Sequence, residues 1–399
     1  MAIKLTDIVV IGAARTPMGR FGGTLKDVPV HDLGAAAIKE ALRRAGVTGE
    51  EVSELIYGNC RQAGNGPNPS RTASVRAGIP LHISTNTINM ACPSGMKAVH
   101  LATEALRLGE SEIVVAGGMD SMSTIPYLLK GVRWEGFRMG PKTLEDGWSD
   151  SIDPLTGQGM GETAENLVEK YGLKREDLDQ IAVESHQKAA AAQEQGLFDE
   201  EITPLEVVPK GKKDKAFSFS RDETIRYDAD LAAMGKLSPS FRKGGCVTAG
   251  NSCGLSDGAC AVVLTTREKA RALGAKPLFS FVSFAQGAVA PETMGEGPGV
   301  TIPLALARAG MGLAEMDLLE VNEAFAAQIL TNELTLKWDR ERLNVHGGAI
   351  ALGHPTGISG CRILITGYYA LKARNKEYLC AAICGGGGVT TAMVIRREN

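Results

Sequence analysis

Ile88-Asn-Met-Ala-Cys-Pro-Ser-Gly-Met-Lys-Ala-Val99 is the stretch on which both the fold and the chemistry depend. The residues that lead into it, 83–90, alternate in character and include β-branched types, which predicts a strand. Residues 96–108 carry apolar side chains at helical spacing, which predicts a helix. Cys92 therefore lies at a strand-to-helix corner. Pro93 suits the first helical position, where its missing N–H costs nothing.

The corner gives Cys92 a possible chemical role. The first free N–H groups and the positive end of the helix point back toward the sulfur, and such an environment stabilises a thiolate. The alternative for a single cysteine is simple core filling, because free cysteines are among the most buried residue types. The remaining motifs of the chain decide between these interpretations.

Composition narrows the class of protein. A chain of 399 residues is long enough for two or three domain units with large cores. Its 44% apolar and 22% charged residues are typical of a globular protein, and its net charge of -3 gives no general attraction to nucleic acid or membranes. No apolar run is long enough to span a bilayer.

The cysteines indicate a reducing compartment. No signal-peptide pattern precedes the first predicted strand, so we expect a cytoplasmic protein without disulfides. No Cys-x-x-Cys pair occurs, so neither a metal site nor a permanently bound cofactor is predicted, and a redox or metal protein remains a remote alternative. The eight cysteines stand at positions 60, 92, 246, 253, 260, 361, 380 and 384.

The chain opens with a predicted strand at 8–12, a glycine turn and a helix at 33–45. A dinucleotide-binding unit starts in the same way, but this turn lacks the second close glycine of that motif. Further short apolar runs predict buried strands, and one more helix is predicted at 70–77. The predicted strands are 55–58, 112–116, 258–264 and 380–383.

An internal repeat organises the chain. Residues 41–59 parallel 306–322, each a helix ending in Ala-Gly, an acidic turn and a short strand ending at Asn. The segment from Ser94-Gly95 to Gly117-Gly118 likewise parallels that from Ser359-Gly360 to Gly385-Gly386. Two similar α/β halves are therefore predicted, with hydrophobic strands covered by helices on both faces.

The region from about 119 to 247 does not fit the repeat. Predicted helices at 162–171 and 175–195 alternate there with irregular, charged stretches, including a basic run at 210–215 that we interpret as a solvated loop. We interpret the whole region as a large insertion in the first half.

Three further segments carry reactive or glycine-rich sequence. They are Asn322-Glu-Ala-Phe-Ala326, the five-glycine segment 347–360 that contains His354, and Cys384-Gly-Gly-Gly-Gly388. Glycine lets backbone approach a ligand closely, so an imidazole and a thiol in such segments can face a substrate. Taken singly, each has a structural alternative, a capping histidine or a tight turn.

Taken together, these segments resemble the thiolase family over essentially the whole chain. The resemblance rests on motifs in the family's order: Gly12-Ala-Ala-Arg-Thr-Pro, Asn68-Pro-Ser-Arg71, Asn89-Met-Ala-Cys92-Pro-Ser-Gly95, Gly117-Gly-Met-Asp-Ser-Met-Ser123, Met160-Gly-Glu-Thr-Ala-Glu165, Thr248-Ala-Gly-Asn-Ser252, Asp257-Gly-Ala259, Asn322-Glu-Ala-Phe325, Gly353-His-Pro355 and Cys384-Gly-Gly-Gly387.

The resemblance implies a set of catalytic roles. Cys92 would take an acyl group as a thioester, and His354 would be the base that activates it. Cys384 would remove the α-proton of a second acetyl-CoA. Asn322, through a water, and His354 would stabilise the enolate oxygen, while the backbone N–H groups of Cys92 and Gly386 would form a second oxyanion hole.

The resemblance also implies contacts to coenzyme A. Arg226 and Lys236 match contacts to its nucleotide end, and each has a solvated-surface alternative. The residues that match the pantetheine and acyl channel are Met160, Ala249, Cys253, Met294 and Phe325. Three positions depart from the common pattern. Gly159 replaces a frequent His, Cys253 a frequent Ser and Pro93 a small residue, so a roomier pocket and a weaker hydrogen bond at 253 are expected.

The fold class expected from the resemblance is a layered α-β-α-β-α core of duplicated halves. Residues 1–120 with 249–275 would form the N-terminal half, 121–248 the inserted CoA-binding domain, and 276–399 the C-terminal half. The expected activity is acetyl-CoA C-acetyltransferase in a homotetramer that is a dimer of dimers, with acyl-CoA and no nucleic acid or membrane as partner. A degradative 3-ketoacyl-CoA thiolase, a decarboxylating condensing enzyme, which usually has a second His where Cys384 stands, and a non-catalytic acyl-CoA scaffold remain alternatives.

Overall fold

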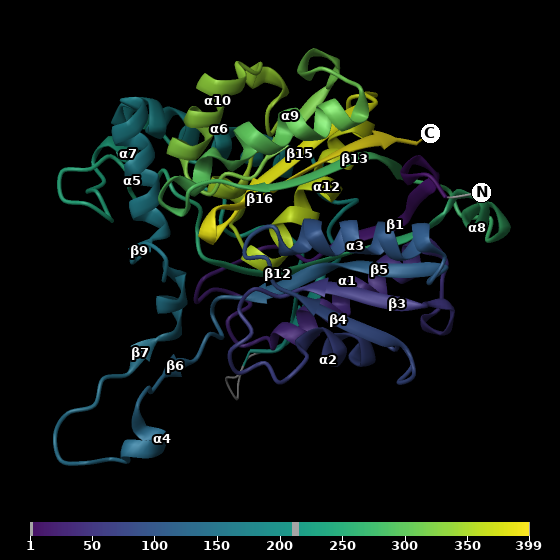
Figure 1. Cartoon of the computed structure of the whole chain (residues 1–399), viewed down its shortest axis with the longest axis horizontal. Coiled ribbons are helices and arrows are strands. Elements are labelled where there is room, and N and C mark those ends of the chain that lie inside the picture. The colour runs from purple at the N-terminus through teal and green to yellow at the C-terminus, as the bar shows by residue number, and fades with distance from the viewer. Residues whose placement is uncertain (1–2, 210–214, 399) are drawn as a thin grey trace.

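The computed structural model describes residues 3–209 and 215–398, so residues 210–214 of the basic run lie outside the described part. Two strand layers lie one above the other with a pair of helices between them (Figure 1). Their strands belong to one ten-stranded sheet, because the edges of the two halves pair through Val9↔Ser280 and Val10↔Phe279. The two predicted sheets are therefore joined along one seam.

The first half contributes five strands in the spatial order β1-β12-β5-β3-β4. The strands β5, β3 and β4 run parallel to one another, whereas β12 is antiparallel to both β1 and β5. The two-residue strand β2 pairs with β12. Their bounds are β1 Ile8–Arg15, β2 Gly19–Arg20, β3 Glu54–Gly58, β4 Ser84–Ile88, β5 Ile113–Ser121 and β12 Ser256–Thr266.

The second half repeats this arrangement in the order β13-β16-β15-β14. The pair β14 and β15 is parallel, with Val321 opposite Ala382, as β3 and β5 are parallel with Gly58 opposite Gly118. A parallel bridge from Leu319 to Leu343 occupies the place that β4 has in the first half. The bounds are β13 Phe279–Ala288, β14 Leu318–Val321, β15 Tyr378–Cys384 and β16 Val389–Arg397.

Helices cover both faces of each strand layer. The helices α3 and α12 lie between the layers, while α9 and α10 lie over the second half (Figure 1). Apolar side chains of α1 and α2 pack on the other face of the first half. The bounds are α1 Val30–Ala45, α2 Pro69–Arg76, α3 Ser94–Leu108, α8 Arg267–Ala272, α9 Gly297–Ala309, α10 Ala326–Leu336, α11 Ala349–Leu352 and α12 Thr356–Ala373.

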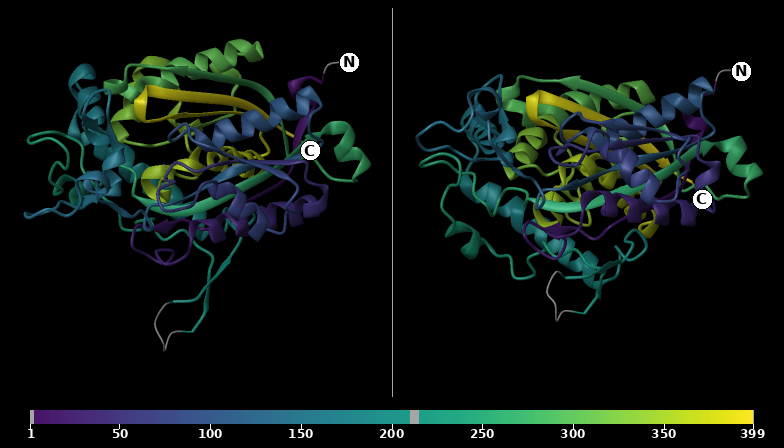
Figure 2. Two further views of the ribbon diagram at one scale, coloured as in Figure 1. Left: turned by 60° about the horizontal axis from the view of Figure 1, so that its bottom comes forward. Right: turned by 90° about the horizontal axis from the view of Figure 1, so that it is seen from below.

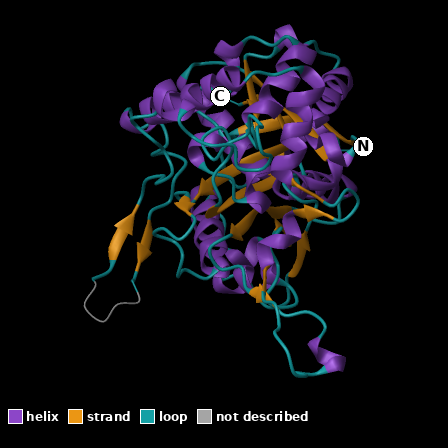
Figure 3. Cartoon of the chain, turned by 90° about the vertical axis from the view of Figure 1, so that its left-hand side faces the viewer, coloured by secondary structure: helices purple, strands orange, loops and turns teal. Residues whose placement is uncertain are grey.

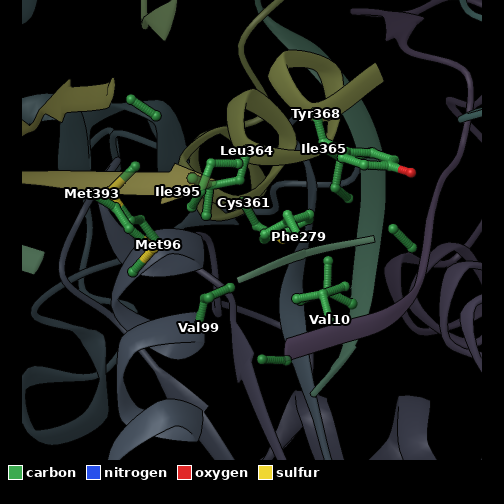
Figure 4. Close-up of a cluster of buried hydrophobic side chains, with 14 of the residues drawn as sticks. Val10, Met96, Val99, Phe279, Cys361, Leu364, Ile365, Tyr368, Met393 and Ile395 are labelled. Atoms are coloured by element: carbon green, nitrogen blue, oxygen red, sulfur yellow. The ribbon is translucent and has the colours of Figure 1, made fainter. Parts of the chain in front are cut away.

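The strands are apolar on both faces because each face packs into a different core. In β5, Val114 belongs to the central core and Val115 to the outer core of the first half. The central core joins α3, α12 and strands of both halves, as Val99, Leu364 and Ile395 show (Figure 4). This burial on both faces explains why the sequence shows continuous apolar runs rather than a clean alternation.

The insertion between β5 and β12 contributes two helices to the core and two projections. The segment β6-α4-β7 extends away from the body in Figure 1, and the β10–β11 hairpin projects in Figures 2 and 3. Apolar residues of α5 and α6 pack on the second half. The bounds are β6 Tyr127–Leu128, α4 Val132–Glu135, β7 Glu145–Asp146, β8 Ile152–Asp153, β9 Gln158–Gly159, α5 Met160–Tyr171, α6 Arg175–Glu194, β10 Leu205–Val207, β11 Phe217–Phe219 and α7 Leu231–Gly235.

Two local predictions were wrong in detail. Pro93 is the N-cap rather than the first helical residue, because the turn places Ser94 there and its hydroxyl donates to Ala91 O at 2.6 Å. The strand predicted at 112–116 runs on to Ser121, since β12 pairs with it along its whole length. Within the described residues, no helix is long and apolar enough to cross a bilayer.

Candidate active site

Cys92 lies at the corner between β4 and α3 and keeps some solvent exposure. The residue before it, Ala91, has a φ of 51°, an uncommon conformation for a side chain with a Cβ. Hydrogen bonds hold this turn, with Met90 N–H donating to Ser94 Oγ at 2.8 Å and Ser94 N–H donating to Ala91 O at 3.0 Å. Strain of this kind persists only where the surroundings fix it, and it occurs often at functional sites.

The glycine run after β15 lies directly against this corner. The backbone N–H of Gly386 faces the Cys92 thiol and acts to lower its pKa. A Cβ at Gly385 would lie 2.5 Å from Cδ of Pro93 and 3.2 Å from the Cys92 nitrogen, so only glycine allows this approach. Cys384, at the end of β15, is close enough for its charge to act on Cys92. The structure thus brings Cys92, Cys384 and Gly386 together.

His354 follows Gly353, whose φ is 90°, and precedes α12. Its Nδ1 is 2.7 Å from Ser359 Oγ, and that hydroxyl donates its one proton to Pro355 O at 3.0 Å. Ser359 must therefore accept from His354, which puts the imidazole proton on Nδ1. The Nε2 atom is left as a bare acceptor, buried and without a partner among the described residues. Such a nitrogen is a general base.

Asn322 is a second buried group without partners. It follows β14, and its N–H donates to Ala382 O at 3.0 Å, which fixes it beside the end of β15 that carries Cys384. Neither its amide nitrogen nor its amide oxygen has a hydrogen-bond partner within the described residues. Unpaired buried polar groups are costly, and in native proteins they are normally satisfied by a ligand or an ordered water. Asn322 is thus suited to bind one.

The resting groups are neutral. Burial raises the pKa of Cys92 to about 12, with the nearby Cys384 acting in the same direction, and burial also raises the pKa of Cys384 to about 12. Burial, followed by the charges of Arg362 and Arg61, lowers the pKa of His354 to about 3. In the resting site, desolvation therefore outweighs the stabilisation of a Cys92 thiolate that is expected from the helix terminus.

Two of the predicted channel residues, Met160 and Cys253, lie beside this centre, and two more, Met294 and Phe325, belong to the hydrophobic cluster that contains Cys384. Met160 begins α5 above the glycine run, where a Cβ at Gly386 would lie 3.2 Å from its Sδ. Cys253 donates its N–H to Ala324 O at 3.1 Å, and its charge acts on Cys384. Phe325 is buried in the same cluster as Met294 and Cys384, and its ring meets that of Phe241 edge-on at 6.1 Å.

The other three predicted contacts lie at the surface. Arg226, Lys236 and Ala249 are all exposed. The Arg226 N–H donates to His186 Nδ1 at 3.1 Å, and Lys236 follows α7 directly. The structure places none of them among the catalytic candidates, and their contact with coenzyme A stays a prediction.

Two buried carboxylates near the site were not predicted. Asp120, near the end of β5, and Glu323, directly after Asn322, are both nearly inaccessible to solvent. Both stand at the carboxyl ends of parallel strands, where polar residues often serve a site, so the sequence did hold a signal for them. The described residues contain no group of three or more His, Cys, Asp or Glu able to hold a metal ion.

Comparison with known proteins agrees with this geometry. The family descriptions "Thiolase, N-terminal domain" and "Thiolase, C-terminal domain" match residues 8–268 and 275–397. The chain is 47% identical to an acetyl-CoA acetyltransferase of Cupriavidus necator over 99% of this chain and 100% of that one. It is 45% identical to one of Escherichia coli over the same shares.

Solved structures show the same likeness. The acetyl-CoA acetyltransferase of Bacillus anthracis superposes with a TM-score of 0.95 at 42% identity, covering 98% of this chain and 99% of that chain. Human mitochondrial 3-ketoacyl-CoA thiolase superposes with a TM-score of 0.95 at 38% identity, covering 99% and 100%. The layered fold of duplicated halves is confirmed. With both family domains matched and this degree of identity, the chain is an acyltransferase and belongs to the thiolase family.

Proposed function

We propose that the chain is an acetyl-CoA C-acetyltransferase that condenses two acetyl-CoA molecules reversibly to acetoacetyl-CoA and CoA. The observation that carries the proposal is the proximity of two thiols, Cys92 and Cys384. The buried Nε2 of His354 and the buried amide of Asn322, both without a partner among the described residues, support the roles of base and enolate-stabilising group. The names of the relatives support the substrate.

The first half-reaction transfers an acetyl group to the protein. His354 Nε2 takes the proton of Cys92, and the resulting thiolate attacks the thioester carbonyl of acetyl-CoA. The thiolate and the imidazolium form together, and each charge stabilises the opposite one. Neither group would carry its charge alone in the buried site. The carbonyl oxygen accepts from the N–H groups of Cys92 and Gly386. The CoA sulfur leaves and takes the proton of Cys384, which becomes a thiolate.

The second half-reaction forms the carbon–carbon bond. The Cys384 thiolate removes the α-proton of a second acetyl-CoA, while Asn322 and the imidazolium of His354 stabilise the enolate oxygen. The enolate carbon attacks the acetyl group on Cys92. The tetrahedral intermediate expels the Cys92 sulfur, which regains its proton from His354. One acetoacetyl-CoA and one CoA result, and every side chain returns to its starting state.

Replacing Cys92 by Ala tests this mechanism. We expect acyl transfer to be abolished and no protein-bound acetyl group to appear in mass spectra after mixing with acetyl-CoA. Turnover that persists in Cys92→Ala would remove the mechanism. Acyl-CoA binding without turnover in the wild type would instead favour the non-catalytic acyl-CoA scaffold.

A second candidate function is thiolysis of longer 3-ketoacyl-CoA substrates. Gly159, directly before Met160, would meet only Glu162 Oε2 at 3.9 Å if it carried a Cβ, so space is open beside the proposed channel. The likeness to human mitochondrial 3-ketoacyl-CoA thiolase is compatible with this alternative. Rates of thiolysis against chain length, from four carbons upward, decide between them. A maximum at long chains would overturn the acetoacetyl assignment.

We further propose that residues 121–248 form the CoA-binding domain between halves of residues 1–120 with 249–275 and 276–399. The exposed cations Arg226 and Lys236 would contact the phosphates of its nucleotide end. Replacing either by Ala should raise KM for acetyl-CoA with little change in kcat. The eight free cysteines fit a reducing compartment, and we propose the cytoplasm and a place in fatty-acid metabolism.

We also propose a homotetramer, a dimer of dimers. The projecting segment β6-α4-β7 exposes a concentration of large apolar side chains, and such patches mark association surfaces. They are Tyr127, Trp134, Phe137, Met139 and Leu144.

A further inference from the structure

The segment 347–360, which carries His354, is held near its beginning by the carboxylate of Glu323. Glu323 Oε1 accepts from Asn344 Nδ2 at 2.8 Å. Its Oε2 accepts from Ser185 Oγ at 2.6 Å and from the Ile350 N–H at 3.1 Å. The carboxylate is buried, and all of these partners donate to it.

The approach of this segment to Glu323 is unusually close. A Cβ at Gly348 would lie 2.2 Å from Cδ of Glu323, so no side chain fits there. The Gly348 N–H instead donates to Ser185 Oγ at 3.1 Å, and the Ser185 hydroxyl in turn donates to Glu323 Oε2. Ser185 belongs to α6 of the insertion. Glu323 therefore links the insertion, the histidine segment and the strand end that carries Asn322.

The same segment is held at its far end by Asp120. Its Oδ2 accepts from Thr356 Oγ1 at 2.8 Å and from the Gly357 N–H at 2.5 Å, at the start of α12. Its Oδ1 accepts from Asn59 Nδ2 at 2.7 Å and from the Arg61 N–H at 2.9 Å. Asp120 thus joins the first half to the residues immediately after His354.

A negative charge is needed at Asp120 and at Glu323 because the hydrogen-bond partners named above all donate to these carboxylates. A carboxylate accepts at both oxygens. An amide would instead turn an NH₂ group toward at least one of these donors, and both that donor and the NH₂ group would then lack an acceptor. Burial raises the pKa of both carboxylates, and the donors act in the opposite direction by stabilising the charged form. Removing one such charge should displace the segment rather than leave it unchanged.

We propose that Asp120 and Glu323 are positioning residues that fix His354 from both sides and, through Glu323, set it relative to Asn322. The proposal rests on the function proposed above, in which His354 and Asn322 stabilise the enolate. Neither carboxylate touches the reacting atoms. A misplacement of about 1 Å at a catalytic group can cost on the order of 100-fold in rate.

The test compares Glu323→Gln and Asp120→Asn with Asp317→Asn. Asp317 is a matched control because its Oδ2 accepts from two N–H groups, of Glu377 and Tyr378, both at 2.9 Å, at the opposite end of the same strand pair. We expect kcat for thiolysis to fall on the order of 10- to 100-fold in the first two variants, with KM nearly unchanged. Asp317→Asn should keep wild-type kcat.

Exchange of the α-protons of acetyl-CoA with D₂O gives a second readout, because it reports enolate formation directly. Exchange should slow in parallel with kcat in both carboxylate variants. If Glu323→Gln fails to fold, Ser185→Ala carries the test, since it removes only the link from Glu323 to Gly348. It should then slow exchange to a smaller degree.

Values of kcat and exchange within twofold of Asp317→Asn would overturn the inference. That outcome leaves the proposed function standing, since wild type and Asp317→Asn would both still turn over. Failure of the proposed function has a different signature, namely turnover in Cys92→Ala.

Discussion

Ser359 decides which nitrogen of His354 carries the proton, because its own proton is used on Pro355 O. Replacing it by Ala removes the acceptor that holds Nδ1–H. The ring can then present either tautomer, and part of the population offers an N–H where the base should be. We expect kcat to fall on the order of 10- to 100-fold with little change in KM, measured by steady-state thiolysis.

Thr335→Ala is the matched control for this variant. Its hydroxyl donates to Thr331 O four residues earlier at 2.9 Å, as that of Ser359 does to Pro355 O, but it lies in α10. It should leave kcat unchanged. Equal kcat in Ser359→Ala and wild type would show that the tautomer is fixed by something else.

Glu320 and Arg362 form a buried pair, 3.9 Å apart, whose carboxylate oxygens have no hydrogen-bond partner among the described residues. Burial raises the pKa of Glu320 from 4.5 to about 8, against the charge of Arg362. Between these values the folded chain holds a proton that the unfolded chain lacks, so stability falls as pH rises through this window.

Glu320→Gln removes that titration. The free energy of unfolding of wild type relative to Glu320→Gln should therefore decrease between pH 6 and pH 9, measured by urea denaturation at each pH. A difference that does not change with pH would contradict the raised pKa of Glu320.

At the scale of elements, α3 and α12 approach each other through glycine. A Cβ at Gly360 would lie 2.7 Å from the Met96 nitrogen, a backbone atom that cannot turn aside. Gly360→Ala should therefore lower the free energy of unfolding by about 1–3 kcal/mol, measured by denaturation. Gly235→Ala, in a position with open space around it, is the control and should be neutral or slightly stabilising. Equal stability of both variants would show that the helices can separate at no cost.

Glycine also explains why the end of β5 was predicted too early in the sequence. Gly117-Gly118 was interpreted as the end of a strand, because glycine is a common turn signal. In the structure β5 continues through both residues. A Cβ at Gly118 would lie 2.2 Å from Gly357 O, so glycine here admits α12 rather than a turn. A neighbour more than two hundred residues away decided its role.

The site shows the same difference between what a local motif can predict and what only distant contacts decide. Cys92, His354, Cys384 and Asn322 could be named from their motifs, because each motif is local. Their protonation could not, since burial of the Cys92 thiol depends on segments that arrive from the far end of the chain. The supporting carboxylates Asp120 and Glu323 were missed for a similar reason: their partners come from distant elements.

At the scale of the whole molecule, the segment β6-α4-β7 tests the proposed assembly. Replacing Trp134, Phe137 and Met139 together by Ser removes most of its exposed apolar surface. We expect a dimer in place of a tetramer, measured by light scattering after gel filtration. Leu334→Ser, an exposed apolar residue of α10, is the control and should keep the wild-type mass. A tetramer in the triple variant would place the contact elsewhere.

The matching strand registers place residues of the site at equivalent positions in the two halves. The residues that follow Gly58 and Val321 are Asn59 and Asn322, and two positions beyond their partners Gly118 and Ala382 stand Asp120 and Cys384. The corner Ala-Cys-Pro-Ser-Gly of one half corresponds to Gly-His-Pro-Thr-Gly of the other, each entered at positive φ. The helices that follow begin at Ser94 and Thr356, so the predicted match of Ser94-Gly95 with Ser359-Gly360 was wrong by three residues.

The proposed nucleophile and the proposed base therefore occupy equivalent positions of the two halves, a sulfur in one and an imidazole in the other. At the position equivalent to Cys384, the proposed proton carrier, the first half has Asp120, whose carboxylate accepts from the Gly357 N–H at the start of α12. Because both halves belong to one chain, equivalent positions can carry different side chains, which two identical subunits related by symmetry could not.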